Sequence, residues 1–170
     1  MINPHLQAGR SVPSDMAVAG PGDAASASLD IGQAEIDAFA DLVGDENPVH
    51  LDPAYAREVG AEPSTAADGG PTEGDCGDGQ PDDDGLFDGT IAHGMLAAGV
   101  ISSALANLPG DIVYVSQDLS FERPVYPGRT VTATAEVAED LGNDMLRAHT
   151  DATVGDETVV SGEAVVLSLE

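Results

Sequence analysis

The chain has 170 residues, 42% of them apolar, and carries 31 Asp and Glu against five Arg and no Lys, a formal net charge of −26. This length suits one domain with a substantial buried core. The acid excess excludes nucleic acid and anionic membranes as partners, because both require a basic face. No apolar stretch is long enough to span a bilayer.

Three further features of the sequence indicate where the protein works. The N-terminus, MINPHLQAGR, lacks a basic segment followed by an apolar one, so we expect no signal peptide and a cytoplasmic protein. A lone cysteine, Cys76, excludes an internal disulfide and a cysteine-rich metal site. The acid excess, the lack of Lys and the 4% aromatic content resemble proteins of halophiles that accumulate salt, since molar salt screens such repulsion. An acidic protein of an ordinary cytoplasm is the alternative.

The first third of the chain predicts a flexible start, one strand and two helices. Residues 1–21 are rich in Gly, Pro, Ala and Ser and predict a flexible lead-in to a single domain over 22–170. Ala24–Ile31 is a candidate first strand. Gln33–Val43 has apolar residues at helical spacing, and Gly44 suits the end of that helix. A short polar turn leads to a second predicted helix, Pro53–Val59.

The middle of the chain is strongly acidic. Residues 62–84 contain almost no apolar side chain and many Asp, so we predict a mobile acidic insertion. A calcium loop is the competing interpretation. The segment has the acids for it but lacks the Asp-x-Asp-x-Asp-Gly spacing closed by a Glu.

The second half of the chain predicts an α+β fold. Met95–Leu108 is apolar almost all round, which is typical of a helix buried on every side. After it, turn signals separate four apolar, β-branched segments that predict an antiparallel meander: 112–121, 130–141, 146–154 and 158–169. The simplest packing of these parts is a curved sheet wrapped around the one apolar helix.

Two of the four histidines suggest chemistry. His5 lies in the lead-in, and His149 falls at a strand position that we expect to be exposed. His50 closes the turn that begins at Asp45, and Pro48 stiffens this turn. A carboxylate and an imidazole five residues apart can converge on one water. The alternative interpretation is a helix-capping Asp45, an Asx turn at Asn47 and a surface His50.

The second histidine, His93, immediately precedes Gly94 and the apolar helix. The first backbone N–H groups of a helix lack partners and lie at its positive end, where an anion or a developing oxyanion is stabilised. Glycine at that position permits close approach of a ligand. The alternative is that His93 and Gly94 merely cap a core helix.

Three sequence blocks together resemble the MaoC-like dehydratase family, the R-specific enoyl-CoA hydratases with a hot-dog fold. These blocks are FADLVGDENPVHLDPAYA at 39–56, LFDGTIAHGML at 86–96 and FERPVYPG at 121–128. The resemblance covers most of the chain, from about residue 22 to 169. Its first block looks like the family's hydratase motif, its second like the start of the central helix, and its third like a strand that leads into a Pro-Gly turn.

The resemblance implies a curved antiparallel sheet around one long helix, a homodimer, and an acyl-CoA substrate. It implies that Asp45 and His50 form the catalytic dyad, that Asn47 holds the dyad loop, and that Gly94 receives the thioester oxygen, with His93 beside it as a further substrate-orienting residue. The expected activity is hydration of trans-2-enoyl-CoA to (R)-3-hydroxyacyl-CoA and the reverse dehydration. No metal and no redox cofactor are expected.

Two alternative functions and one departure from the family pattern remain. A hot-dog acyl-CoA thioesterase, or a non-catalytic acyl-binding or dimerisation module, would share the fold. Forty-two residues separate His50 from His93, more than the family usually has, and the acidic insertion accounts for the excess.

Arg123 and Arg129 flank the Pro-Gly turn and are candidates for contacts to the CoA phosphates, or they form surface ion pairs with nearby acids.

Overall fold

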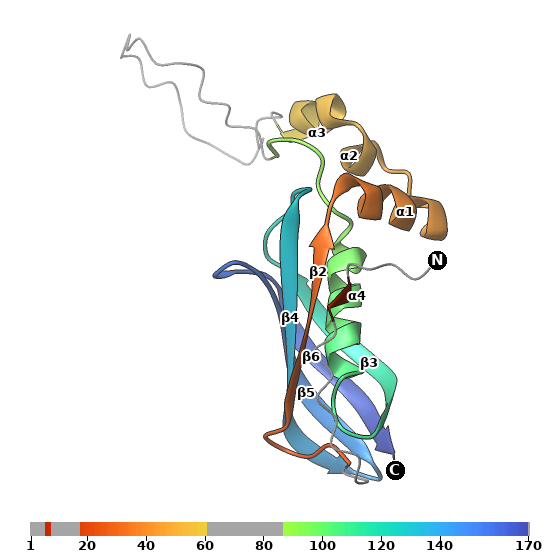
Figure 1. Ribbon diagram of the computed structural model, residues 1–170, viewed down its shortest axis with the longest axis vertical. Helices are drawn as coiled ribbons and strands as arrows, with labels where there is room; N and C mark the ends of the chain where they lie inside the picture. Colours follow the sequence, from red (N-terminus) through yellow and green to blue (C-terminus); the bar gives the residue numbers. More distant parts are fainter. Residues whose placement is uncertain (1–5, 8–17, 61–86, 170) are drawn as a thin grey trace, which may run out of the picture.

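The computed structural model describes residues 6–7, 18–60 and 87–169, and the predicted helices and strands occur in it in the predicted order (Figure 1). In chain order the elements are β1 (Leu6–Gln7), β2 (Ala24–Ile31), α1 (Gln33–Val43), α2 (Pro48–Leu51), α3 (Pro53–Gly60), α4 (Gly94–Leu105), β3 (Asp111–Phe121), β4 (Arg129–Gly142), β5 (Met145–Val154) and β6 (Glu157–Leu169).

The strands form one antiparallel sheet in the order β1-β2-β4-β5-β6-β3. The helix α4 lies along one face of the curved sheet, against β2, β4 and β5 (Figure 1). Alternate residues of β4 are buried against it, as expected for a sheet with one solvated face. The largest fully buried apolar side chains of this core include Ile101, Leu105, Val131, Val137 and Val166. The predicted α+β class is therefore confirmed.

The short helices gather where α4 begins. Figure 1 shows α1, α2 and α3 at the end of the sheet from which the first turn of α4 emerges. The αL conformation of Gly44, with φ of 74°, ends α1 and turns the chain toward this region. The arrangement brings the turn after α1 close to the N-terminus of α4, although the two are far apart in sequence.

Most predicted boundaries agree with the structure to within three residues, and those of β2 and α1 coincide with it. Two short elements were not predicted. The polar turn before α3 contains the helix α2, which starts with Pro48 at its first position, where the missing N–H costs no hydrogen bond. Within the expected flexible lead-in, β1 pairs with Ser28 and Leu29 of β2.

The prediction that the central helix is buried on every side was wrong. The sheet covers only one side of α4, and Met95 is 61% exposed on the other, together with Gly99, Ser102 and Ala106. A helix against a single sheet has one face left over, whatever its composition. Its end also differs, because α4 stops at Leu105 and tighter turns carry the chain to Leu108.

Several predictions lie outside the described residues. These are His5, Cys76, the acidic insertion at 62–84 and much of the lead-in. Within the described part, none of the helices has both the length and the apolar character that crossing a bilayer requires.

Candidate active site

The turn between α1 and α2 is braced by its own side chains. The Asn47 N–H donates to Oδ1 of Asp45 at 3.3 Å, and the Val49 N–H donates to Oδ1 of Asn47 at 3.3 Å. Asn47 is extended, with φ of −58° and ψ of 125°, as expected for a residue before proline. The turn therefore has a defined shape, and Asn47 holds it by capping α2.

His50 is oriented by the chain segment that precedes α4. Its Nδ1 lies 2.8 Å from the carbonyl oxygen of Ile91, and the Ile91 N–H donates to the Val49 carbonyl at 3.2 Å. A carbonyl oxygen only accepts, so Nδ1 of His50 carries the proton of the neutral ring. Its Nε2 is left with a lone pair that is free to accept a proton.

His93 is buried, with 2% exposure, and contacts both members of the expected dyad. Its Nε2 donates to the backbone carbonyl of Asp45 at 2.9 Å and lies 4.0 Å from Oδ2 of the same residue. Its ring stacks on that of His50, with 3.8 Å between centroids and 30° between planes. Phe39 packs on it at a centroid distance of 5.0 Å.

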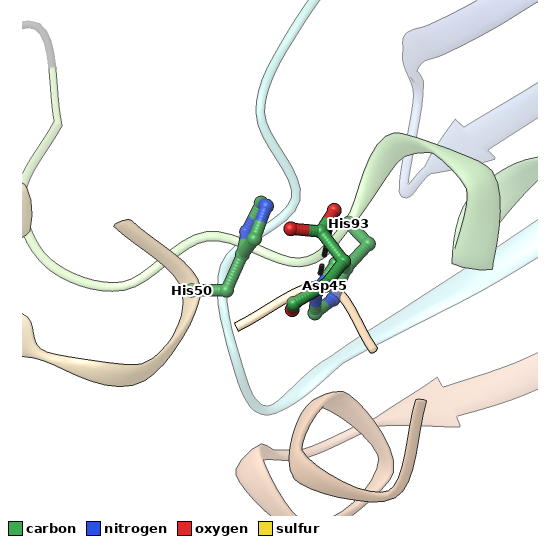
Figure 2. Close-up of side chains that lie close together, drawn as sticks. All are labelled: Asp45, His50 and His93. Atoms are coloured by element: carbon green, nitrogen blue, oxygen red, sulfur yellow. Dashed lines mark hydrogen bonds and ion pairs between the residues drawn. The ribbon is translucent and has the colours of Figure 1, made fainter. Parts of the chain in front are cut away.

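The structure thus brings together Asp45, His50 and His93, one ligand atom from each lying within 4.8 Å of the others (Figure 2). Figure 2 shows the Asp45 carboxylate turned toward the His50 ring. The Asp45 side chain is 54% exposed, so water reaches it freely. A carboxylate and an imidazole that lie this close are able to hold one water between them.

These three side chains also have the spacing of metal ligands, but two of their ring nitrogens already donate hydrogen bonds. Nδ1 of His50 and Nε2 of His93 both carry protons that they donate to carbonyl oxygens. A cation bound through either of these nitrogens would break one of these hydrogen bonds. The Asp45 carboxylate, Nε2 of His50 and the buried Nδ1 of His93 remain as possible donors. The hydrogen bonds of the site therefore disfavour a cation held through Nδ1 of His50 or Nε2 of His93.

Gly94 lies where two cavities meet. It begins α4, and it lines both a cavity of about 490 Å³ and one of about 420 Å³, together with His50, His93 and Met95. Asp45 and Phe39 line the smaller cavity, and Phe121 and Val160 line the larger. A Cβ on Gly94 would lie 2.8 Å from the Phe121 ring, so a larger residue at this helix start would require that ring to move. A carbonyl group in the larger cavity is thus able to approach the positive end of α4.

The two arginines next to the Pro-Gly turn line a neighbouring cavity of about 430 Å³, which shares Arg123, Pro124 and Val125 with the larger one. Nη1 of Arg123 pairs with Oε1 of Glu157 at 2.8 Å. Arg129 forms no ion pair with any residue that the structure describes. Arg129 is therefore the freer of the two cations.

The other described histidine is separate from this site. His149 is exposed on β5, as predicted, and its Nδ1 lies 3.2 Å from Oε1 of Glu163. Conversely, sequence reasoning missed the Ile91 carbonyl as the partner of His50, as well as the contact from His93 to Asp45. Backbone carbonyls have no signature in a sequence, so no pattern pointed to either contact.

Comparisons with known proteins identify the family of the chain. Residues 83–160 match the family model described as MaoC like domain. The chain is 34% identical over 149 residues to an (R)-specific enoyl-CoA hydratase of Rhodospirillum rubrum, covering 86% of this chain and 85% of that protein. It is 36% identical over 141 residues to a 3-hydroxybutyryl-CoA dehydratase of Methylorubrum extorquens, covering 81% and 73%.

Among solved structures, the chain is similar to the (R)-hydratase from Aeromonas caviae involved in PHA biosynthesis. The TM-score is 0.68 at 32% identity, and the match covers 89% of this chain and 98% of the other. This likeness confirms the predicted hot-dog fold.

Proposed function

The chain belongs to the MaoC-like dehydratase family, and from that premise we propose that Asp45 and His50 catalyse the (R)-specific hydration of trans-2-enoyl-CoA and the reverse dehydration. The protein is accordingly a hydro-lyase. The observation that carries the assignment is the convergence of the Asp45 carboxylate and the His50 ring beside the start of α4.

The hydrogen bonds of the dyad suggest a division of roles. With its Nδ1 proton held by the Ile91 carbonyl, His50 keeps an unprotonated Nε2, and this residue lines both cavities beside Gly94. In the proposed step, this nitrogen takes a proton from the water that the Asp45 carboxylate orients. The water oxygen bonds to C3 of the substrate, and the dyad returns one proton to C2 on the same face. The product is an (R)-3-hydroxyacyl-CoA.

Gly94 is the proposed electrophilic partner in this reaction. Its N–H, with the positive end of α4, would receive the thioester oxygen and draw electrons away from the double bond. One preorganised donor of this kind typically contributes roughly 3–4 kcal/mol to transition-state stabilisation. Asn47 holds the dyad turn in this scheme, and His93 completes the wall that orients the substrate beside Gly94.

The proposed reaction requires neither a metal nor a redox cofactor. Addition of water to a double bond transfers no electrons to a carrier. The thioester carbonyl is activated in this scheme by a hydrogen bond rather than by a Lewis acid. Coenzyme A enters only as part of the substrate.

One assay tests this function against its two rivals. With crotonyl-CoA in molar KCl, a hydratase removes the ultraviolet absorbance of the conjugated enoyl thioester without releasing thiol. Release of free thiol would instead indicate the thioesterase. Binding of the acyl-CoA with no turnover would indicate the non-catalytic module.

We propose further that Arg129, and to a lesser degree Arg123, contact the CoA phosphates. Arg129→Gln is expected to raise the KM for crotonyl-CoA about fivefold with little change in kcat, since one solvated ion pair contributes roughly 1 kcal/mol. Arg123→Gln should have a smaller effect, because Arg123 already pairs with Glu157. Arg147→Gln is the matched control, since Arg147 pairs with Glu139 and lines none of the three cavities of the site. An unchanged KM in both Arg129→Gln and Arg123→Gln would contradict the proposal.

The proposed working form is a homodimer. The edge strand β3 leaves Val113 and Val115 exposed at 46% and 52%, and Met95 on the bare side of α4 is also exposed. The Tyr114 phenol lies between these two valines in sequence, and partial burial raises its pKa. An apolar edge strand beside an apolar helix face favours association with a second copy.

We also propose that the protein works in a cytoplasm of high salt. The melting temperature is expected to rise by about 10 °C between dilute buffer and molar KCl, because screening relieves the repulsion among the surface carboxylates by several kcal/mol. Differential scanning fluorimetry over a KCl series measures this shift. Sucrose at matched osmolality is the control, and an equal rise in sucrose, or none in KCl, would refute the charge-screening explanation.

A further inference from the structure

We infer that His93 is a positioning residue that sets the geometry between the dyad and the amide of Gly94, acting through the backbone of Asp45. This inference rests on the proposed function. His93 is the only residue in the described part of the chain that hydrogen-bonds the Asp45 backbone through its side chain, stacks on His50 and is covalently joined to Gly94.

A hydrogen bond from His93 joins the dyad turn to the start of α4. The dyad turn follows α1, whereas Gly94 belongs to α4, so their separation depends on contacts between distant parts of the chain. The His93 Nε2–H bond to the Asp45 carbonyl, 2.9 Å long and 48 residues apart in sequence, connects them directly. Because the bond is made to the backbone of Asp45, it places that residue without occupying its carboxylate.

The other ring nitrogen of His93, Nδ1, is buried and accepts no hydrogen bond from any described residue. An unsatisfied buried polar atom destabilises a fold, and an aromatic hydrocarbon ring in this place would avoid the loss. The histidine is therefore poorly explained by stability alone. Its Nε2–H donor is the feature that a hydrocarbon ring lacks.

The His93 ring also stacks on the ring of His50. With centroids 3.8 Å apart, the His93 ring supports the face of the His50 ring, while the Ile91 carbonyl fixes its rotation. His50 is thus held on its face and at its edge. The remaining freedom in the dyad lies in the Asp45 turn, which the His93 donor restrains.

Two substitutions distinguish the role of the His93 N–H donor from that of its aromatic ring. His93→Phe keeps an aromatic ring against His50 but removes both the donor and the unpartnered nitrogen. We expect kcat for crotonyl-CoA to fall at least about tenfold, because small displacements of reacting groups are costly, while KM changes less than about threefold. The melting temperature should not fall. His93→Gln restores an N–H at a similar reach and is expected to retain kcat within about threefold of the unsubstituted protein.

His149→Gln is the matched control for these variants, because it removes an exposed imidazole at a distance from the site. Full kcat in His93→Phe would overturn the inference. So would an equal loss of kcat in His93→Phe and His93→Gln, because the donor would then not matter. Activity that merely follows the melting temperature across the series would indicate a structural role and would also overturn it.

A measurement on the unsubstituted protein tests the link without any substrate, and it applies even if His93→Phe does not fold. The measurement is the ¹⁵N NMR spectrum of the imidazole rings, in which the His93 signals are identified by their loss in His93→Gln. We expect the ring proton of His93 on Nε2 and slow exchange of this proton with water. A proton on Nδ1, or rapid exchange at Nε2, would overturn the inference. Failure to hydrate any enoyl-CoA would refute the proposed function instead. The NMR result on the His93 proton would still test the hydrogen bond, because it needs no substrate.

Discussion

Asp45→Asn and His50→Gln are each expected to lower kcat for crotonyl-CoA hydration by about a thousandfold, within the range that general acid–base groups contribute. Asn at 45 keeps an oxygen for the Asn47 N–H but loses the negative charge that orients the water. Gln at 50 offers an amide where the free imidazole nitrogen stood, and an amide does not take up a proton at neutral pH.

The fold should survive both changes. The Asp45 side chain is half-exposed, and His50 lies in the short helix α2, outside the buried core. Circular dichroism and the melting temperature at molar KCl check this, with Glu46→Gln as the control that removes the adjacent exposed acid. Rates near those of the unsubstituted protein in both Asp45→Asn and His50→Gln would refute the dyad.

The double variant adds a sharper test. If the two groups hold the same water, losing one already disables the unit, so the combined loss should be far smaller than the product of the single losses. Single-turnover rates of all four proteins, the unsubstituted one included, measure this coupling. Fully multiplicative losses would indicate two groups that act in separate steps.

Gly94→Ala is expected to lower kcat/KM by about a hundredfold, which corresponds to the loss of one well-placed oxyanion donor. The substitution keeps the backbone N–H but adds a methyl group 2.8 Å from the Phe121 ring. Either the ring moves into the larger cavity or the methyl group keeps the carbonyl away from the amide. Steady-state kinetics over a range of crotonyl-CoA concentrations measures the loss.

The same helix offers a matched control. Gly99 lies one turn further along α4, is exposed, and has no atom within 4 Å of an added Cβ. Gly99→Ala should leave kcat/KM unchanged and stabilise the fold by about 0.5–1 kcal/mol, since alanine favours a helix. Equal activity of Gly94→Ala and Gly99→Ala would contradict the role of Gly94.

Most helices and strands were predicted well because their signals, such as the spacing of apolar residues and the turn residues at their ends, lie within the segment itself. The apolar residues of α1 recur at helical spacing and Gly44 ends it, so both boundaries of this helix were predicted correctly. The short helix α2 was missed because a single turn has no periodicity. The exposure of Met95 was missed because composition does not say on which side a sheet will lie.

The candidate site also has features that the sequence predicted and contacts that it did not. The sequence by itself determined which groups are available: a carboxylate and an imidazole on a proline-stiffened turn, and a glycine at the start of an apolar helix. Only the tertiary structure decided how they meet. Ile91 selects the tautomer of His50, and His93 connects the Asp45 turn to α4. Both contacts join backbone carbonyls to side chains more than 40 residues away, and packing rather than residue type specifies such partners.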